Sequence, residues 1–206
     1  MYVDIVDVGC GNIGSIRNWV ENTNISTRVV SNVRELKSQI IVLPGVGAAG
    51  YYLKSLRASN FDNAILEHVD KGGRLIGICL GFQAMSDFCE ENSGHRGLGL
   101  IKGEVKKLNG LHSNNQWQPF KLSKDRMGVQ SFYQQANLTK KRTVKGRVFF
   151  NHEYGFVVDD KKAYSQPINK ELSNYSAVAV KDRIIGMQFH PEKSQKTGLE
   201  IIQMIL

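Results

Sequence analysis

A cysteine between two glycines, Gly77-Ile-Cys79-Leu-Gly81, is the feature that most constrains how this chain can fold. It follows the apolar segment 74–78, which predicts a strand, and opens the segment 82–88, which predicts a helix. The glycines allow a sharp turn that holds the central side chain above the edge of a sheet. A thiol there faces a helix start, whose partial positive charge favours the thiolate. We interpret Cys79 as a candidate nucleophile; the alternative is a small buried core cysteine.

A second motif, Gln-Phe-His190-Pro-Glu192, ends an apolar strand-like run far downstream. Residues two apart on a strand point the same way, so His190 and Glu192 are a candidate base and the group that orients it. A cysteine that attacks a carboxamide needs such a base, and a carboxylate on the far ring nitrogen fixes the tautomer. A structural histidine and a solvated surface glutamate are the alternatives for each residue alone.

Composition favours one ordinary globular domain spanning residues 1–206. The chain of 206 residues is 41% hydrophobic and 22% charged, and it can bury a substantial core. We expect no membrane segment, because no apolar run approaches the ~18 residues of a membrane helix, and no signal peptide is visible. Three cysteines, Cys10, Cys79 and Cys89, favour free thiols in a reducing, cytoplasmic compartment. No cysteine or histidine spacing predicts a metal site.

The formal charge of +8 raises the question of a nucleic-acid partner. The basic residues are spread out, and no recognised module interleaves them with aromatic residues. Short clusters such as 140–142 and 161–162 are typical of solvated loops. We therefore expect no nucleic-acid partner, and a basic face that docks on an acidic protein remains open.

Alternating strand and helix patterns predict an α/β fold with an open, mostly parallel sheet flanked by helices. In the first half, strands are predicted at 3–8, 27–30, 39–43 and 74–78, and helices at 12–22 and 61–69. The second half predicts an antiparallel extension, with strands at 105–108, 143–150, 154–158 and 177–180. The stretches 111–127 and 159–174 are predicted to be rich in loops.

The two motifs, extended to Gln83 and Ser194, resemble those of the class I (triad) glutamine amidotransferases. Within that class, Leu-Pro-Gly45-Val46-Gly47-Ala and Gly-Cys-Gly-Asn12-Ile-Gly-Ser15 are most similar to the glutaminase subunit of imidazole glycerol phosphate synthase. The resemblance covers nearly the whole chain, in the expected order. It implies hydrolysis of glutamine to glutamate and ammonia, with no cofactor.

The resemblance also implies roles for individual residues. Cys79 is the nucleophile, His190 the acid and base, and Glu192 its orienter. The backbone N–H groups of Val46 and Leu80 form the oxyanion hole, for which the Gly45–Val46 peptide has to reorient. The residues implied in glutamine binding are Gly45, Gly47, Gln83, His152, Glu153 and Tyr154.

A partner is implied as well: a (β/α)8-barrel cyclase that forms a heterodimer with this chain and receives ammonia through a tunnel for histidine biosynthesis. The residues implied at that interface are Asn12, Ser15, Met127 and Lys193. The segment 9–14 also matches the dinucleotide fingerprint Gly-x-Gly-x-x-Gly. We reject nucleotide binding, because the acidic residue expected about 20 positions on is missing.

The chain departs from the histidine-pathway pattern at three places. It has Asp-Val-Gly at 7–9 for the usual Asp-Tyr-Gly, Met-Gly-Val-Gln at 127–130 for Met-Gly-Trp-Asn, and Glu153 for the Ser or Thr between His152 and Tyr154. These changes keep open a divergent paralogue that supplies ammonia to an amidotransferase acting on surface-polysaccharide sugars. A cysteine peptidase on the same fold and a purely regulatory subunit are further alternatives.

Overall fold

The structure is a computed structural model that describes residues 2–110, 112–127 and 143–206. Its helices are α1 (Ile13–Glu21), α2 (Ala49–Ala58), α3 (Phe61–Asp70), α4 (Leu80–Gln83), α5 (Lys124–Met127) and α6 (Gln195–Ile205), with 3-10 turns η1 (Val33–Glu35), η2 (Glu91–Ser93) and η3 (Pro191–Lys193). Its strands are β1 (Tyr2–Val6), β2 (Ser26–Val30), β3 (Ile40–Gly45), β4 (Arg74–Cys79), β5 (Phe88–Cys89), β6 (His95–Arg96), β7 (Gly103–Lys107), β8 (Asn114–Ser123), β9 (Thr143–His152), β10 (Tyr154–Val158), β11 (Tyr164–Pro167), β12 (Ser176–Lys181) and β13 (Ile184–Met187). The departure at 128–130 lies outside the described residues.

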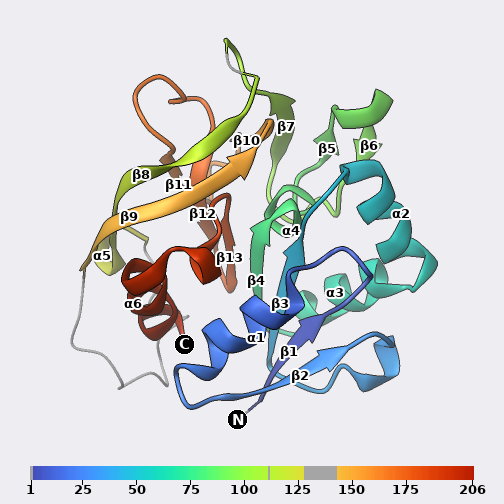
Figure 1. The fold of residues 1–206 in the computed structure, drawn as a ribbon. Helices are drawn as coiled ribbons and strands as arrows, with labels where there is room; N and C mark the ends of the chain where they lie inside the picture. The colour runs from blue at the N-terminus through green and yellow to red at the C-terminus, as the bar shows by residue number, and fades with distance from the viewer. Residues whose placement is uncertain (1, 111, 128–142) are drawn as a thin grey trace.

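A seven-stranded sheet in the order β11-β12-β13-β4-β3-β1-β2 forms the centre of the molecule (Figure 1). The strands from β13 to β2 pair in parallel, whereas β12 and β11 add antiparallel pairs at one edge. The predicted α/β class, with a mostly parallel sheet and an antiparallel extension, is confirmed. The predicted helix at 61–69 and the strands of the parallel half lie where the sequence pattern places them, within two residues at each end.

Two hydrophobic cores cover the faces of this sheet. On β3, Val42 packs into the core beneath α1 and α6, and Leu43 into the core beneath α2 and α3. Such a strand is buried on both faces, which explains its unbroken apolar sequence. The Trp19 indole N–H donates to the Gly198 carbonyl at 2.8 Å and ties α1 to α6. Burying each Val, Ile or Leu side chain fully contributes about 1.5–3 kcal/mol to the free energy of folding, so these two layers stabilise the sheet.

Two predicted segments are wrong. The helix predicted at 82–88 ends at Gln83, because the carbonyls of Ala84 and Met85 accept from Leu98 and Leu100 at 2.8 and 2.9 Å instead of continuing the helix. The loop predicted at 111–127 contains the ten-residue strand β8, which pairs with β9 along its whole length. Pro119, in the middle of β8, is a residue that disfavours strands, so the pairing with the distant strand β9 decides the structure of this segment. The stretch 159–174, predicted to be rich in loops, is irregular apart from the short strand β11.

The β8–β9 hairpin lies across the carboxyl ends of the parallel strands, beside α6 (Figure 1). A separate four-stranded sheet, β10-β7-β5-β6, lies on the other side of β4. Both additions therefore surround the sheet edge at which β3, β4 and β13 end. In the described part of the chain, no helix combines the length and the apolar character needed to cross a membrane.

Candidate active site

Three neighbouring strand ends build the site. In the sheet register Gly45 of β3 lies beside Cys79 of β4, and Ile78 lies beside Met187 of β13. Ligand sites of open α/β sheets form where the carboxyl ends of parallel strands share an edge. Gly45, Cys79 and the segment that follows Met187 therefore meet at one place, although 142 positions separate Gly45 from Met187 in the sequence.

Cys79 occupies a sharp, strained turn between β4 and α4. Its φ of 52° and ψ of −111° lie in a region that non-glycine residues rarely adopt. A Cβ on Gly81 would lie 1.8 Å from the Leu43 carbonyl oxygen, so only glycine allows α4 to pack against β3. A Cβ on Gly77 would lie 2.4 Å from the Met85 side chain. The turn predicted from the glycine spacing is therefore present, and Cys79 is 6% exposed at its tip.

His190 and Glu192 form a buried pair beside this turn. The Nδ1 atom of His190 lies 2.8 Å from Oε1 of Glu192, and their side chains are 3% and 0% exposed. The predicted pairing is present, but the reason given for it is wrong: β13 ends at Met187, and the 3-10 turn η3 brings Glu192 back under the ring. The His190 N–H also donates to the Phe149 carbonyl at 2.8 Å, which anchors the segment to β9.

The protonation of His190 follows from these neighbours. Burial lowers its pKa, but its interactions with the Cys79 thiol and with Glu192 outweigh burial and raise the pKa to about 10. Within the described structure, the Oε2 atom of Glu192 is buried without a hydrogen-bond partner, so the imidazolium is the main compensation for this carboxylate. A protonated histidine beside a cysteine is the arrangement that activates thiol nucleophiles.

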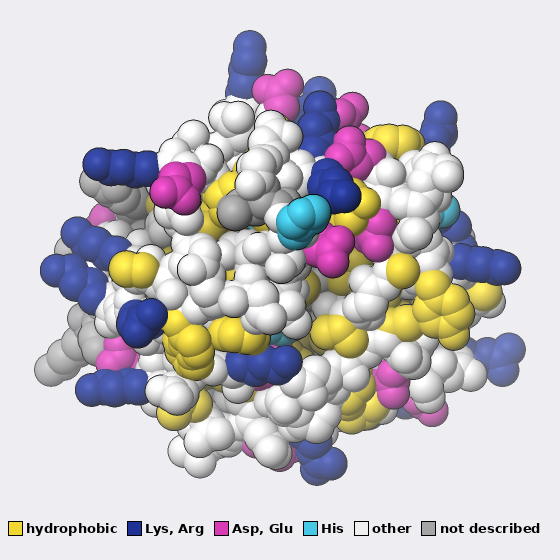
Figure 2. All heavy atoms as spheres, turned by 45° about the horizontal axis from the view of Figure 1, so that its top comes forward, with side chains coloured by type: hydrophobic (Ala, Val, Ile, Leu, Met, Phe, Trp, Pro, Cys, Tyr) yellow, Lys and Arg dark blue, Asp and Glu magenta, His cyan; other side chains and the backbone are white. Residues whose placement is uncertain are grey.

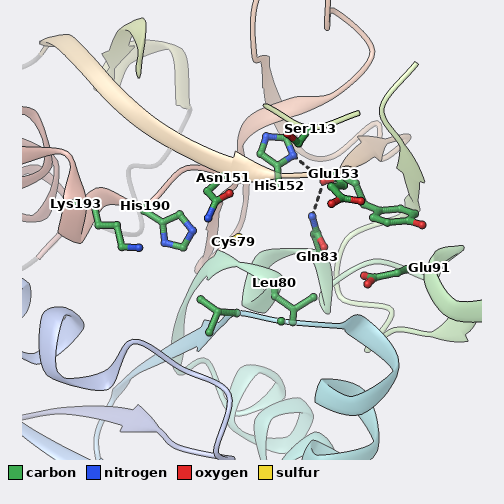
Figure 3. Close-up of a pocket in the computed structure, with 13 residues that line it drawn as sticks. Cys79, Leu80, Gln83, Glu91, Ser113, Asn151, His152, Glu153, His190 and Lys193 are labelled. Atoms are coloured by element: carbon green, nitrogen blue, oxygen red, sulfur yellow. Dashed lines mark hydrogen bonds between the residues drawn. The ribbon is translucent and has the colours of Figure 1, made fainter. Parts of the chain in front are cut away.

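A pocket of about 360 Å³ opens above Cys79 (Figure 3). It is lined by Val46, Gly47, Cys79, Leu80, Gln83, Glu91, Ser113, Asn151, His152, Glu153, Tyr154, His190 and Lys193. Sequence reasoning missed Glu91, Ser113 and Asn151, together with Gln188, which is 0% exposed behind the pocket. Gln188 stood within the recognised motif, whereas the other three carry no local signal. Lys193 and His190 lie on one side of Cys79, and Glu153 and Glu91 on the other (Figure 3).

One of the two predicted oxyanion donors points away from the pocket. The Val46 N–H donates to the Cys10 carbonyl at 2.9 Å, so the Gly45–Val46 peptide has to rotate before this N–H can face Cys79. Gly47, which follows Val46, has a φ of +100°, which glycine alone adopts readily. Leu80 begins α4, so its N–H belongs to the first turn, where helices leave donors without intrahelical acceptors.

His152 is held as a neutral ring. Burial lowers its pKa to about 4; the Tyr154 carbonyl opposes the shift and the charge of His190 adds to it. Its Nδ1–H donates to the Tyr154 carbonyl at 2.7 Å, and its Nε2 accepts from Asn114 Nδ2 at 3.0 Å. Both ring nitrogens are thus used inside the protein, and His152 faces the pocket without a free polar atom.

The residues predicted at a partner interface do not form one surface. Lys193 is exposed at the pocket rim, and its Nζ atom lies 5.9 Å from the centre of the Phe149 ring. Helix α1, which contains Ser15, packs beside the turn η3 that ends at Lys193. Asn12 precedes α1 without capping it through its side chain. Met127 is 4% exposed and packs into the core, so in this structure it is not available to a partner.

Comparison with known proteins agrees with this geometry. A family model for class I glutamine amidotransferases matches residues 4–205. The imidazole glycerol phosphate synthase subunit HisH of Chlorobium chlorochromatii is 34% identical over 201 residues, covering 97% of this chain and 96% of that protein. HisH of Aquifex aeolicus is 31% identical, covering 97% and 93%. A crystal structure of a glutamine amidotransferase shares the fold with a TM-score of 0.74 at 14% identity, covering 98% of this chain and 96% of that one. The family predicted from the motifs is confirmed: this chain belongs to the class I glutamine amidotransferases.

Proposed function

We propose that this chain is the glutaminase subunit of an imidazole glycerol phosphate synthase, hydrolysing glutamine and passing ammonia to a cyclase. The observation that carries the proposal is the strained Cys79 turn beside a His190–Glu192 pair joined at 2.8 Å, under a pocket of about 360 Å³. The pathway is supported by the HisH relatives, which match nearly their full length.

In the first half of the reaction, Cys79 Sγ bonds to the side-chain carbonyl carbon of glutamine. The carbonyl oxygen takes the negative charge, and the carbon–nitrogen bond then breaks. His190 gives its proton to the leaving nitrogen, so ammonia departs and a glutamyl thioester remains. The raised pKa of His190, about 10, supports this role, because the ring holds a proton before the bond breaks.

In the second half, a water oxygen attacks the thioester carbon and gives a proton to His190. The carbon–sulfur bond breaks, glutamate leaves, and the thiolate and the protonated His190 are restored. Glu192, bonded to Nδ1, keeps Nε2 directed at the reacting atoms throughout and stabilises the imidazolium.

The oxyanion of both halves is stabilised by the N–H groups of Leu80 and Val46. Val46 becomes a donor only when its hydrogen bond to Cys10 breaks and the Gly45–Val46 peptide rotates. Losing one oxyanion donor lowers kcat by a factor of about 10²–10³. Because Val46 is not a donor in this conformation, we expect the chain alone to hydrolyse glutamine slowly.

The charges of the pocket orient the substrate. Glu91 and Glu153 lie at the end away from Lys193 and attract the α-ammonium group of glutamine (Figure 3). Burial raises the pKa of Glu91, the N–H of Ala49 lowers it, and the charge of Glu153 raises it further. Glu91 thus takes a cation more favourably than a lone surface carboxylate does. Gln83 lines the same pocket and supplies a polar contact to the substrate.

The partner we propose is a (β/α)8-barrel cyclase that docks near Lys193 and α1 and receives the ammonia. On the face shown in Figure 2, the Lys and Arg side chains of the described residues are scattered over the outline and the interior of the view and form no continuous basic patch, which supports a protein partner over nucleic acid. The three free cysteines support a cytoplasmic location, and we treat residues 1–206 as a single domain.

The test is glutamate release from glutamine by the chain alone and with the histidine-pathway cyclase of the same organism plus its ribonucleotide substrate. Strong stimulation by that pair is expected. If Cys79-dependent glutamate release does not change when the cyclase and its substrate are added, the assignment to histidine biosynthesis is overturned and the sugar-modifying paralogue is favoured. Glu153, in place of the usual Ser or Thr, is the residue that supports this second candidate. Peptide cleavage without glutamine turnover would overturn the glutaminase itself.

A further inference from the structure

A continuous series of hydrogen bonds runs from the loop before β12, through the β8–β9 hairpin, to the sulfur of Cys79. In the outer part, the Leu172 N–H donates to Asn169 Oδ1 (2.8 Å), and Asn169 Nδ2 donates to Gln118 Oε1 (2.9 Å). In the hairpin, Gln118 Nε2 donates to Asn114 Oδ1 (2.8 Å), and Asn114 Nδ2 donates to His152 Nε2 (3.0 Å). His152 Nδ1 then donates to the Tyr154 carbonyl (2.7 Å). This series ends on an oxygen that can only accept.

The Tyr154 carbonyl fixes the orientation of the next side chain. It also accepts from Gln83 Nε2 at 2.7 Å, so the NH₂ end of that amide must face it. The second N–H of the same group reaches Gln188 at 3.1 Å, and Gln188 must therefore present its oxygen, Oε1. Its own NH₂ end is left to face Cys79, with Nε2 at 3.8 Å from Sγ. The Tyr154 carbonyl therefore fixes the orientation of the Gln83 amide, and the Gln83 amide in turn fixes Gln188 with its N–H group toward the sulfur of Cys79.

We propose that Gln188 is a further catalytic residue, whose side-chain amide donates a hydrogen bond to Cys79 Sγ and stabilises the thiolate that attacks glutamine. The proposal rests on the glutaminase function argued above. When the thiol proton moves to His190, the negative charge left on sulfur is held by the Gln188 N–H in addition to the imidazolium. A neutral amide performs this role without competing with His190 for the proton.

The burial of Gln188 supports this assignment. The side chain is 0% exposed, and a buried amide costs free energy unless both of its ends are bonded. Its bonds to Gln83 and Cys79 satisfy it at both ends. Gln188 does not line the pocket, so it acts on the nucleophile and not on substrate binding.

The experiment compares Gln188→Met and Gln188→Glu with the wild type in the rate at which iodoacetamide alkylates Cys79 at pH 7, without glutamine. Methionine fills a similar volume without a donor. Glutamate keeps the shape and the acceptor for Gln83 but replaces the donor with a carboxylate. Peptide mass spectrometry separates Cys79 from Cys10, which serves as an internal reference; burial and then the charge of Asp7 raise the pKa of the Cys10 thiol. Gln116→Met is the matched control, because Gln116 is an exposed side branch that donates to Asn114.

Both Gln188 variants are expected to slow alkylation of Cys79 about tenfold or more, the size expected for losing a hydrogen bond to a charged group, while Cys10 and Gln116→Met stay at wild-type rates. In turnover, kcat falls and KM stays within about twofold. Alkylation of Cys79 within twofold of wild type, in whichever variant keeps the wild-type melting temperature, would overturn the proposal. If the wild type releases no glutamate with any partner but the alkylation difference persists, the role of Gln188 at the thiolate stands and the glutaminase assignment fails.

Discussion

The N–H of Val46, one of the two predicted oxyanion donors, donates to the carbonyl of Cys10 at 2.9 Å. Cys10 belongs to the glycine-rich loop at 9–14 whose sequence imitates a dinucleotide-binding fingerprint. In the structure this loop packs onto the end of β3, where a Cβ on Gly11 would lie 3.3 Å from Pro44 Cγ. The Tyr52 hydroxyl donates to the Pro44 carbonyl at 2.7 Å, so rotation is confined to the Gly45–Val46 peptide.

Replacing Val46 with proline tests the oxyanion donor. Proline has no N–H, so it removes both the bond to Cys10 and the donor that rotation would supply. We expect kcat of the partner-activated enzyme to fall about 10²–10³-fold. Val46→Ala keeps the N–H and serves as the control, with kcat close to wild type. Equal kcat for the two variants, at equal melting temperatures, would exclude Val46 from the oxyanion hole.

Cys79→Ala is expected to abolish glutamate release and leave the melting temperature within a few degrees of wild type. Cys89→Ala is the matched control: Cys89 is also buried, and burial raises its pKa to about 11, so it remains a thiol at neutral pH. It should retain most of the activity. Glutamate release by purified Cys79→Ala would rule out the proposed nucleophile.

The pairing of His190 predicts a pH-dependent stability. Because its folded pKa, about 10, exceeds the ordinary value of 6.5, the stabilisation is fully present below pH 6.5 and is lost as pH rises toward 10. Glu192→Gln removes one of the interactions that raise this pKa. We expect the melting temperature of the variant to fall less between pH 7 and pH 10 than that of the wild type. Parallel curves for the two proteins would show that Glu192 does not hold the proton on His190.

Glu153→Gln tests the acidic end of the pocket. Losing one of two carboxylates near the ammonium group should raise KM for glutamine about two- to fivefold and leave kcat nearly unchanged, and added salt should shrink the difference. Glu104→Gln, an exposed change that does not touch the pocket, is the control. A lower KM in Glu153→Gln would mean that this carboxylate repels the substrate carboxylate instead.

The sequence by itself determined the features that depend on near neighbours. An apolar run such as Ile40–Leu43 favours a strand buried on both faces, and the glycines at 77 and 81 favour a sharp turn at Cys79. These local constraints were enough to predict the parallel sheet and the sharp turn at Cys79. They also identified the two residues that pair beside it, His190 and Glu192.

Only the tertiary structure decided what depends on distant pairing. Strand β8 forms because β9 pairs with it, despite Pro119, and that hairpin carries Asn151 and His152 over the sheet edge. The helix after Cys79 stops at Gln83 because segment 98–101 takes the next carbonyls. Gln188 acquires its direction from Gln83 and Tyr154, which lie 105 and 34 positions away in the sequence. Hydrogen-bond direction is a property of a closed three-dimensional network, so no local pattern of residues encodes it.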